Sequence, residues 1–74
     1  MDKVALITGG RSGIGLACAQ KLSQSGYEVV TAQRSPAADF VSIEADFSDS
    51  EIPKQVIQQV IDRHGRLDAL VNNA

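Results

Sequence analysis

The apolar residues of the chain follow two spacings, which predict strands and helices in turn. Four short runs are rich in apolar residues and bounded by turn-forming residues, as expected for strands buried on both faces of a parallel sheet. These runs cover residues 3–8, 27–32, 40–45 and 67–72. Elsewhere apolar residues recur every three or four positions, which is the spacing of one helix face. The pattern therefore predicts an alternation of strands and helices.

Two helices are predicted between these strands. The first begins at Gly13 and stops at Gly26, and its apolar face carries Ile14, Ala17, Cys18 and Leu22. The second ends near His64 and Gly65. Its apolar stripe consists of Ile52, Val56, Ile57, Val60 and Ile61. Its start has two candidates, because Ser48 with Glu51 spells a capping box, whereas Ser50 as N-cap leaves Pro53 in the first turn. We expect Ser50 to be the cap.

The order strand, helix, strand, strand, helix, strand predicts the α/β class, a parallel sheet with helices packed on it. Only residues 34–39 separate the second strand from the third, which is too short for the usual crossover helix. We expect a tight loop there, containing Pro36 and two alanines. We expect the 74 residues to make at most one small domain, with no second one.

Composition and charge narrow the function classes. The net charge is −2 and the seven Lys and Arg residues are scattered, so no nucleic-acid partner is expected. Cys18 is the single cysteine, so it cannot form an internal disulfide, and no Cys/His spacing suggests a metal site. A single cysteine without a disulfide partner fits the reducing cytoplasm. The first ten residues resemble neither a signal peptide nor a membrane span, so no membrane partner is expected.

The stretch TGGRSGIG, residues 8–15, follows the first strand and opens the first helix. So many glycines indicate that φ becomes positive or that another group approaches the backbone closely. At a strand-to-helix turn, backbone N–H groups and the helix dipole can bind a pyrophosphate. A P-loop is excluded because no Lys-Ser/Thr follows the glycines, and G-x-G-x-x-G fails because Cys18 stands where its last glycine would be. A purely structural turn remains the alternative.

Four motifs together resemble the short-chain dehydrogenase/reductase family, classical type, over the whole chain. Thr8-Gly9-x-x-x-Gly13-Ile14-Gly15 is similar to the family's cofactor loop. In the family's order there follow Asp46, the run from His64 to Val71, and Asn72-Asn73-Ala74, which resembles the start of an Asn-Asn-Ala-Gly signature. The resemblance implies that residues 1–74 are the N-terminal part of a Rossmann dinucleotide-binding domain. It also implies strand order 3-2-1-4, with the fourth strand as an open apolar edge.

The resemblance also implies a set of cofactor-binding residues. Those around the pyrophosphate and its adjoining ribose would be Gly9, Arg11, Ser12, Gly13, Ile14 and Gly15. Those near the adenine and the ribose would be Asp46, Phe47, Asn72, Asn73 and Ala74. Alternatives stay open for three kinds of residue. Arg11 either meets a 2′-phosphate or points into water, Asp46 could be a turn or cap residue, and the two asparagines could be structural.

The choice of dinucleotide depends on Gln33 and Arg34 at the end of the second strand. Sites that prefer NAD place an acidic residue there, about 20 positions after the glycines, and its carboxylate repels a 2′-phosphate. Here Gln33 takes that place, and Arg34 carries a guanidinium suited to phosphate, although it could also be a solvated loop residue. The absent acid predicts NADP(H), with NAD(H) as the alternative.

The family's chemistry uses a tyrosine, a lysine and a serine that lie beyond a segment of this length. Tyr27 is the single tyrosine and has no lysine four positions later, so no catalytic residue is assigned and the 74 residues alone are expected to be inactive. The resemblance implies a longer oxidoreductase that transfers hydride between a nicotinamide and a carbonyl or alcohol substrate. We expect as partners the remainder of that chain and further copies in a homo-oligomer. The alternative is a non-catalytic nucleotide-binding or regulatory module.

Overall fold

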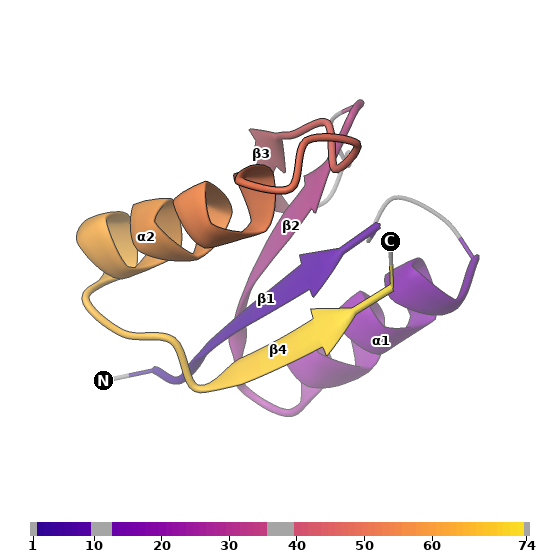
Figure 1. Ribbon diagram of the computed structural model, residues 1–74. Helices are drawn as coiled ribbons and strands as arrows, with labels where there is room; N and C mark the ends of the chain where they lie inside the picture. Colours follow the sequence, from indigo (N-terminus) through magenta and orange to yellow (C-terminus); the bar gives the residue numbers. More distant parts are fainter. Residues whose placement is uncertain (1, 10–12, 36–39, 74) are drawn as a thin grey trace.

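In a computed structural model, residues 2–9, 13–35 and 40–73 are described. Their strands form one parallel sheet, and two helices pack on it (Figure 1). Its strands lie in the order β3-β2-β1-β4. Their bounds are β1 Val4–Thr8, β2 Glu28–Gln33, β3 Val41–Glu44 and β4 Ala69–Asn72. The α/β class and the Rossmann-like strand order 3-2-1-4 are thus confirmed, and the strand ends differ from the predicted runs by one or two residues. The central strand β1 is buried at all of its positions.

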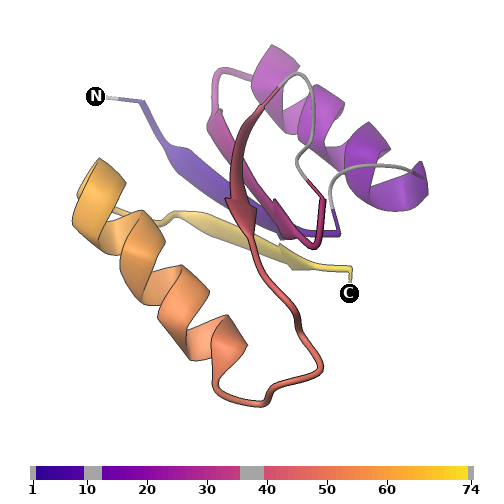
Figure 2. The ribbon, with the colours of Figure 1, turned by 90° about the horizontal axis from the view of Figure 1, so that it is seen from above.

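The two helices cover opposite faces of the sheet (Figure 2). Helix α1 (Gly13–Gln24) packs on the face that carries Ile7 and Val29, through its buried Ala19. Helix α2 (Ile52–His64) packs on the other face. That larger core joins Val56 and Val60 of α2 to the strand residues Val4, Leu6, Val30, Ala32 and Ile43. The central strands β1 and β2 therefore alternate their side chains between two apolar layers, which explains their unbroken apolar runs.

The start of α2 differs from the prediction. The N-cap residue is Glu51, which makes no side-chain capping bond, so the expectation of Ser50 is wrong by one position. The carboxylate of Asp49 accepts a hydrogen bond from the Glu51 N–H at 2.9 Å, and the Asp49 carbonyl accepts one from the Ile52 N–H at 3.2 Å. An Asx turn at Asp49 therefore starts the helix, and Pro53 lies in its first turn as expected.

Strands β2 and β3 pair in parallel although few residues connect them. Their register pairs Val30 with Val41 and Gln33 with Glu44, and the Ala45 N–H donates to the Gln33 carbonyl at 2.9 Å. Pro36 and its neighbours up to residue 39 lie outside the described residues. Since all strands run the same way, their carboxyl ends share one edge of the sheet, which is where ligands of open α/β sheets bind. None of the described helices is long and apolar enough to cross a membrane.

Candidate functional site

The glycine loop, residues 8–15, leaves β1 at Gly9 in the left-handed backbone conformation. Gly9 has φ of +70° and Gly13, the first residue of α1, has φ of +61°, a region that side chains rarely adopt. The Gly9 N–H donates to the Ala32 carbonyl of β2 at 2.8 Å, so the start of the loop is fixed to the neighbouring strand. Arg11 and Ser12, both predicted to surround the pyrophosphate, lie outside the described residues. Ile14 is 75% exposed at the start of α1, which leaves it accessible to a ligand or to further protein.

Gly15 is required by a close approach of backbone to backbone. A Cβ atom at this position would collide with the carbonyl oxygen of Gly9 and would lie 2.8 Å from Nδ2 of Asn73. A Cβ at Gly9 would lie 3.3 Å from the Asn73 carbonyl oxygen. The first turn of α1 therefore packs directly on the ends of β1 and β4. Such packing brings the N–H groups of the α1 N-terminus to the edge of the sheet, where an anion can approach them.

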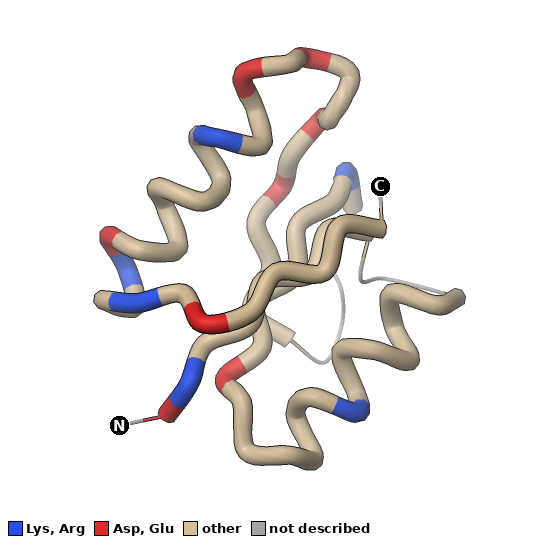
Figure 3. Tube along the Cα trace, turned by 60° about the horizontal axis from the view of Figure 1, so that its bottom comes forward, with Lys and Arg blue, Asp and Glu red and all other residues tan. Residues whose placement is uncertain are grey.

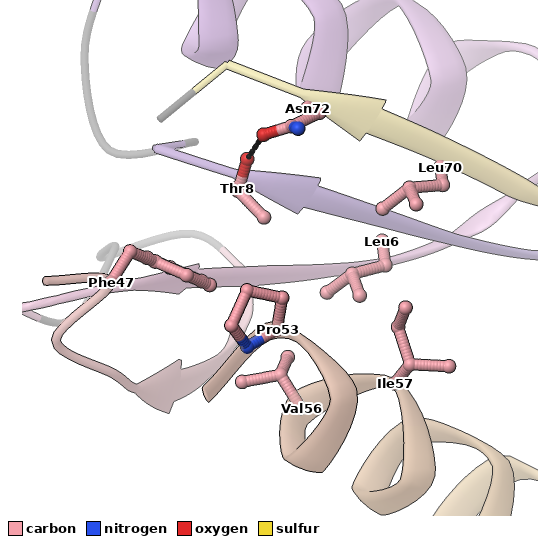
Figure 4. A pocket seen from close by; sticks show the side chains of 8 residues that line it. All are labelled: Leu6, Thr8, Phe47, Pro53, Val56, Ile57, Leu70 and Asn72. Carbon is pink, nitrogen blue, oxygen red and sulfur yellow. Dashed lines mark hydrogen bonds between the residues drawn. The ribbon is translucent and has the colours of Figure 1, made fainter. Parts of the chain in front are cut away.

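A hydrogen-bonded cluster of Thr8, Asn72 and Asn73 joins the ends of β1 and β4. The Thr8 hydroxyl accepts a hydrogen bond from the Asn73 N–H at 2.8 Å and donates to Oδ1 of Asn72 at 3.1 Å (Figure 4). The Asn73 side-chain amide lies 3.4 Å from the Gly9 carbonyl, to which it donates. The two asparagines thus hold β4 against the glycine loop. Thr8 was absent from the predicted site residues, although its place directly before Gly9 was the signal for it.

A small cavity lies between this cluster and the start of α2. It has a volume of about 70 Å³, and its lining consists of Leu6, Thr8, Phe47, Pro53, Val56, Ile57, Leu70 and Asn72 (Figure 4). Phe47, predicted to flank the adenine, comes from the segment between β3 and α2 and packs on the core of the α2 face. Leu70 of the edge strand β4 is 50% exposed beside it. This side of the site is therefore apolar.

Arg34 and Asp46 form an ion pair at the ends of β2 and β3. Nη2 of Arg34 lies 3.0 Å from Oδ2 of Asp46, with the two side chains 77% and 53% exposed. The other oxygen, Oδ1, accepts a hydrogen bond from the Ser48 N–H at 3.0 Å. The Ser48 N–H first, and then the Arg34 guanidinium, lower the pKa of Asp46 to about 2. The carboxylate is therefore ionised and fixed in orientation at neutral pH. Of the two structural alternatives for Asp46, a helix cap or a turn residue, the contact with Ser48 supports the turn, and the same side chain also holds Arg34.

Gln33 is buried at the end of β2, at 8% exposure, and its two amide atoms have no hydrogen-bond partner among the described residues. A buried amide without a partner is costly, so this position suits a polar ligand group. Beside it an open hollow is lined by Arg34, Glu44, Ala45 and Asp46. Figure 3 shows acidic positions repeating along the chain from β3 to α2. The acidic surroundings of Arg34 thus come from this segment.

The structure brings the predicted site residues together in two neighbouring groups along the carboxyl edge of the sheet. Gly9, Gly15 and Asn73 are in mutual contact, with Asn72 bonded to Thr8, while Arg34 and Asp46 are paired at the ends of β2 and β3, next to Gln33. Ala74 lies outside the described residues. Tyr27 precedes β2 at the opposite edge, where Nζ of Lys3 lies 6.0 Å from its ring centre. Within residues 2–9, 13–35 and 40–73, no cluster of His, Cys, Asp or Glu could hold a metal ion.

Residues 3–74 match the short chain dehydrogenase family. The chain is 36% identical to 3-ketodihydrosphingosine reductase of Bacteroides thetaiotaomicron, an alignment that covers 97% of this chain and 28% of that protein. The structure of this chain matches that of ligand-free aldohexose dehydrogenase of Thermoplasma acidophilum with a TM-score of 0.90 at 32% identity, over 99% of this chain and 29% of the other. A metagenomic short-chain oxidoreductase in complex with NADP matches with a TM-score of 0.86 at 34% identity, over 97% and 38% of the two chains.

These likenesses cover nearly all of this chain and a minor part of each relative. Among three of the curated relatives the matched part is 32%, 28% and 33% of their length. The chain thus spans about a third of the proteins that it matches.

Proposed function

This chain belongs to the short-chain dehydrogenase/reductase family, and on that premise we propose that it binds the adenosine and pyrophosphate portion of NADP(H) within a longer oxidoreductase. Residues 1–74 would form the N-terminal part of a dinucleotide-binding domain. The complete protein would transfer hydride between the nicotinamide and a carbonyl or alcohol substrate, in the cytoplasm and as a homo-oligomer. When bound, the cofactor supplies the hydride, and the residues described above supply binding and orientation.

The observation that carries the dinucleotide proposal is the bare backbone at the junction of β1 and α1. Gly15 packs so closely on Gly9 and Asn73 that no side chain fits, and Gly9 and Gly13 both have a positive φ. A pyrophosphate there would receive backbone N–H groups and the positive end of the helix dipole. We assign Arg11, Ser12 and Ile14 to the same subsite, and Asn73 and Ala74 to its ribose side.

The preference for NADP over NAD is supported by the end of β2. NAD-preferring sites use a carboxylate to bind the adenosine ribose hydroxyls and to repel a 2′-phosphate, and here the side chain is the amide of Gln33. Its buried amide atoms lack partners among the described residues, so a ribose hydroxyl or phosphate oxygen would satisfy them. Arg34 follows with an exposed guanidinium that suits a phosphate. Asp46 and Phe47 would flank the adenine.

Substituting Gln33 by Asp tests the preference on the complete protein. A carboxylate at this position should shift the ratio of the NADPH and NADH dissociation constants toward NADH by about 5–150-fold, the equivalent of about 1–3 kcal/mol for hydrogen bonds to a charged group. Titration calorimetry measures both constants. Gln59→Asp, which adds the same charge on the exposed face of α2, is the control and should leave the ratio unchanged. An unmodified protein that binds NADH more tightly than NADPH would refute the proposal.

A non-catalytic nucleotide-binding module is the second candidate function, because the contacts described above support binding of a nucleotide and do not by themselves require turnover. Tyr27 is the single tyrosine, and it packs at the edge of the sheet opposite the glycine loop. The two candidates differ in turnover. An enzyme would oxidise NADPH in the presence of some member of a panel of aldehydes and ketones, followed by absorbance at 340 nm, whereas a module would bind NADPH and leave it unchanged with every member.

A further inference from the structure

The guanidinium assigned to the 2′-phosphate already has a partner inside the protein. Nη2 of Arg34 donates to Oδ2 of Asp46 at 3.0 Å, between residues twelve positions apart in the sequence. The register of β2 and β3, with Gln33 opposite Glu44, brings the two side chains to the same end of the sheet. A phosphate that binds Arg34 must therefore compete with a carboxylate or share the guanidinium with it.

Asp46 is well suited to hold Arg34. Its Oδ1 accepts the Ser48 N–H at 3.0 Å, and this turn aims Oδ2 at the guanidinium. Glu44 lines the same hollow without an ion pair to Arg34 among the described residues, so Asp46 is the partner that sets the position of the guanidinium. The contact uses one guanidinium nitrogen, while a phosphate is bound best by two parallel N–H groups of an arginine.

We propose that Asp46 is a specificity-determining residue, which limits the preference for a 2′-phosphate by holding Arg34 and by placing a negative charge beside the phosphate. The inference rests on the proposed function. It differs from an adenine contact of Asp46, because an adenine contact acts equally on ligands with and without the 2′-phosphate. The distinguishing quantity is therefore a ratio of two affinities.

The expected effect combines two modest contributions. An exposed ion pair is weak, and releasing Arg34 from it should raise affinity for the phosphate by about 1.5–5-fold. Removing a like charge several ångströms from a phosphate in water contributes a factor of similar size, reduced by salt. Together they predict a gain of about 3–10-fold in the affinity for a 2′-phosphorylated ligand relative to its unphosphorylated counterpart.

The experiment uses adenosine 2′,5′-bisphosphate and adenosine 5′-monophosphate as probes of the complete protein, with dissociation constants from calorimetry. Asp46→Asn keeps an oxygen for the Ser48 N–H and removes the charge that holds Arg34. It should raise the ratio of the monophosphate constant to the bisphosphate constant by about 3–10-fold. Arg34→Gln should lower that ratio, and in its background Asp46→Asn should have a clearly smaller effect. Asp49→Asn removes a charge from the same segment, where Asp49 accepts the Glu51 N–H, and should leave the ratio unchanged.

Three results would overturn the inference. If Asp46→Asn weakens both nucleotides by the same factor, Asp46 acts on the adenine alone. If the effect of Asp46→Asn is undiminished in the Arg34→Gln background, Arg34 does not mediate it. If neither nucleotide binds the unmodified protein, the proposed function fails and the inference fails with it, whereas in the first two cases the proposed function stands.

Discussion

Replacing Gly15 by alanine tests the packing of the glycine loop, because two physical effects predict opposite results. Gly15 lies in the first turn of α1, and its own φ is not positive, since the positive values among the described residues are at Gly9, Gly13, Gly26 and Gly65. Backbone entropy and helix propensity alone would make the alanine variant more stable, by about 0.5–1 kcal/mol. The observed contacts predict the reverse.

The magnitude follows from what the new methyl group would meet. It would collide with the carbonyl oxygen of Gly9 and lie 2.8 Å from Nδ2 of Asn73. The asparagine amide can turn away, but Gly9 is held by its N–H bond to the Ala32 carbonyl at 2.8 Å, so α1 must move. Overpacking costs about 1–3 kcal/mol, and a collision with a fixed backbone oxygen belongs in the upper half of that range, so a net destabilisation of about 1–2 kcal/mol remains after the helix gain.

Thermal unfolding and cofactor titration of the complete protein measure this effect. A loss of about 1–2 kcal/mol lowers Tm by roughly 2–8 °C in a chain of 150–250 residues. If bound NADPH requires the original loop, the same strain weakens its binding by about 5–30-fold. Gln20→Ala, on the exposed face of the same helix, is the matched control and should change neither quantity appreciably. A Gly15→Ala protein that is as stable as the original and binds NADPH equally well would refute the packing argument.

Three further predictions follow from the contacts of the sheet edge. Thr8→Val removes the hydroxyl that accepts the Asn73 N–H and donates to Asn72, so it should destabilise the protein by about 1–3 kcal/mol in urea unfolding, and an unchanged midpoint would contradict this. The pKa of Asp46 is lowered from 3.8 to about 2, so its contribution to stability is complete above about pH 4 and is lost as pH falls toward 2. Urea midpoints should decline over that window, and less so in Asp46→Asn; an equal decline in both proteins would argue against it. Expressed alone, the 74 residues expose Leu70 on the edge strand β4 and Ile14 on α1, so circular dichroism should show no cooperative melt; a sharp transition in a monomer would contradict the need for further protein against β4.

The arrangement of strands and helices could be predicted from the sequence because each element is consistent in its own spacing. The four apolar runs became the four strands: β1 and β2 are covered by a helix layer on either face, and the edge strands β3 and β4 are partly exposed. The start of α2 could not be predicted as reliably. Ser48, Ser50 and Asp49 all favour caps, and only the geometry of the turn shows that the Asp49 carboxylate takes the Glu51 N–H.

For the candidate site, local motifs identified the loop, while contacts across the sheet were not predicted. The glycines gave the close approach, because no other residue fits it. The pairing of Arg34 with Asp46 depends on the register of β2 and β3, which the sequence does not specify. The burial of the Gln33 side chain likewise follows from its position in the finished sheet. Sequence reasoning therefore named these residues separately, and the structure adds how they act on one another.

Hydrogen exchange of the complete protein, measured by mass spectrometry with and without saturating NADPH, tests the central claim most directly. If this part of the chain binds the adenosine and pyrophosphate, peptides covering residues 9–15, 33–34, 46–47 and 72–74 should exchange more slowly with the cofactor present. Peptides from the opposite edge, around Tyr27 and the C-terminal end of α2 at His64, should be unchanged. Protection confined to other parts of the protein, with the glycine loop unaffected by NADPH, would contradict the account.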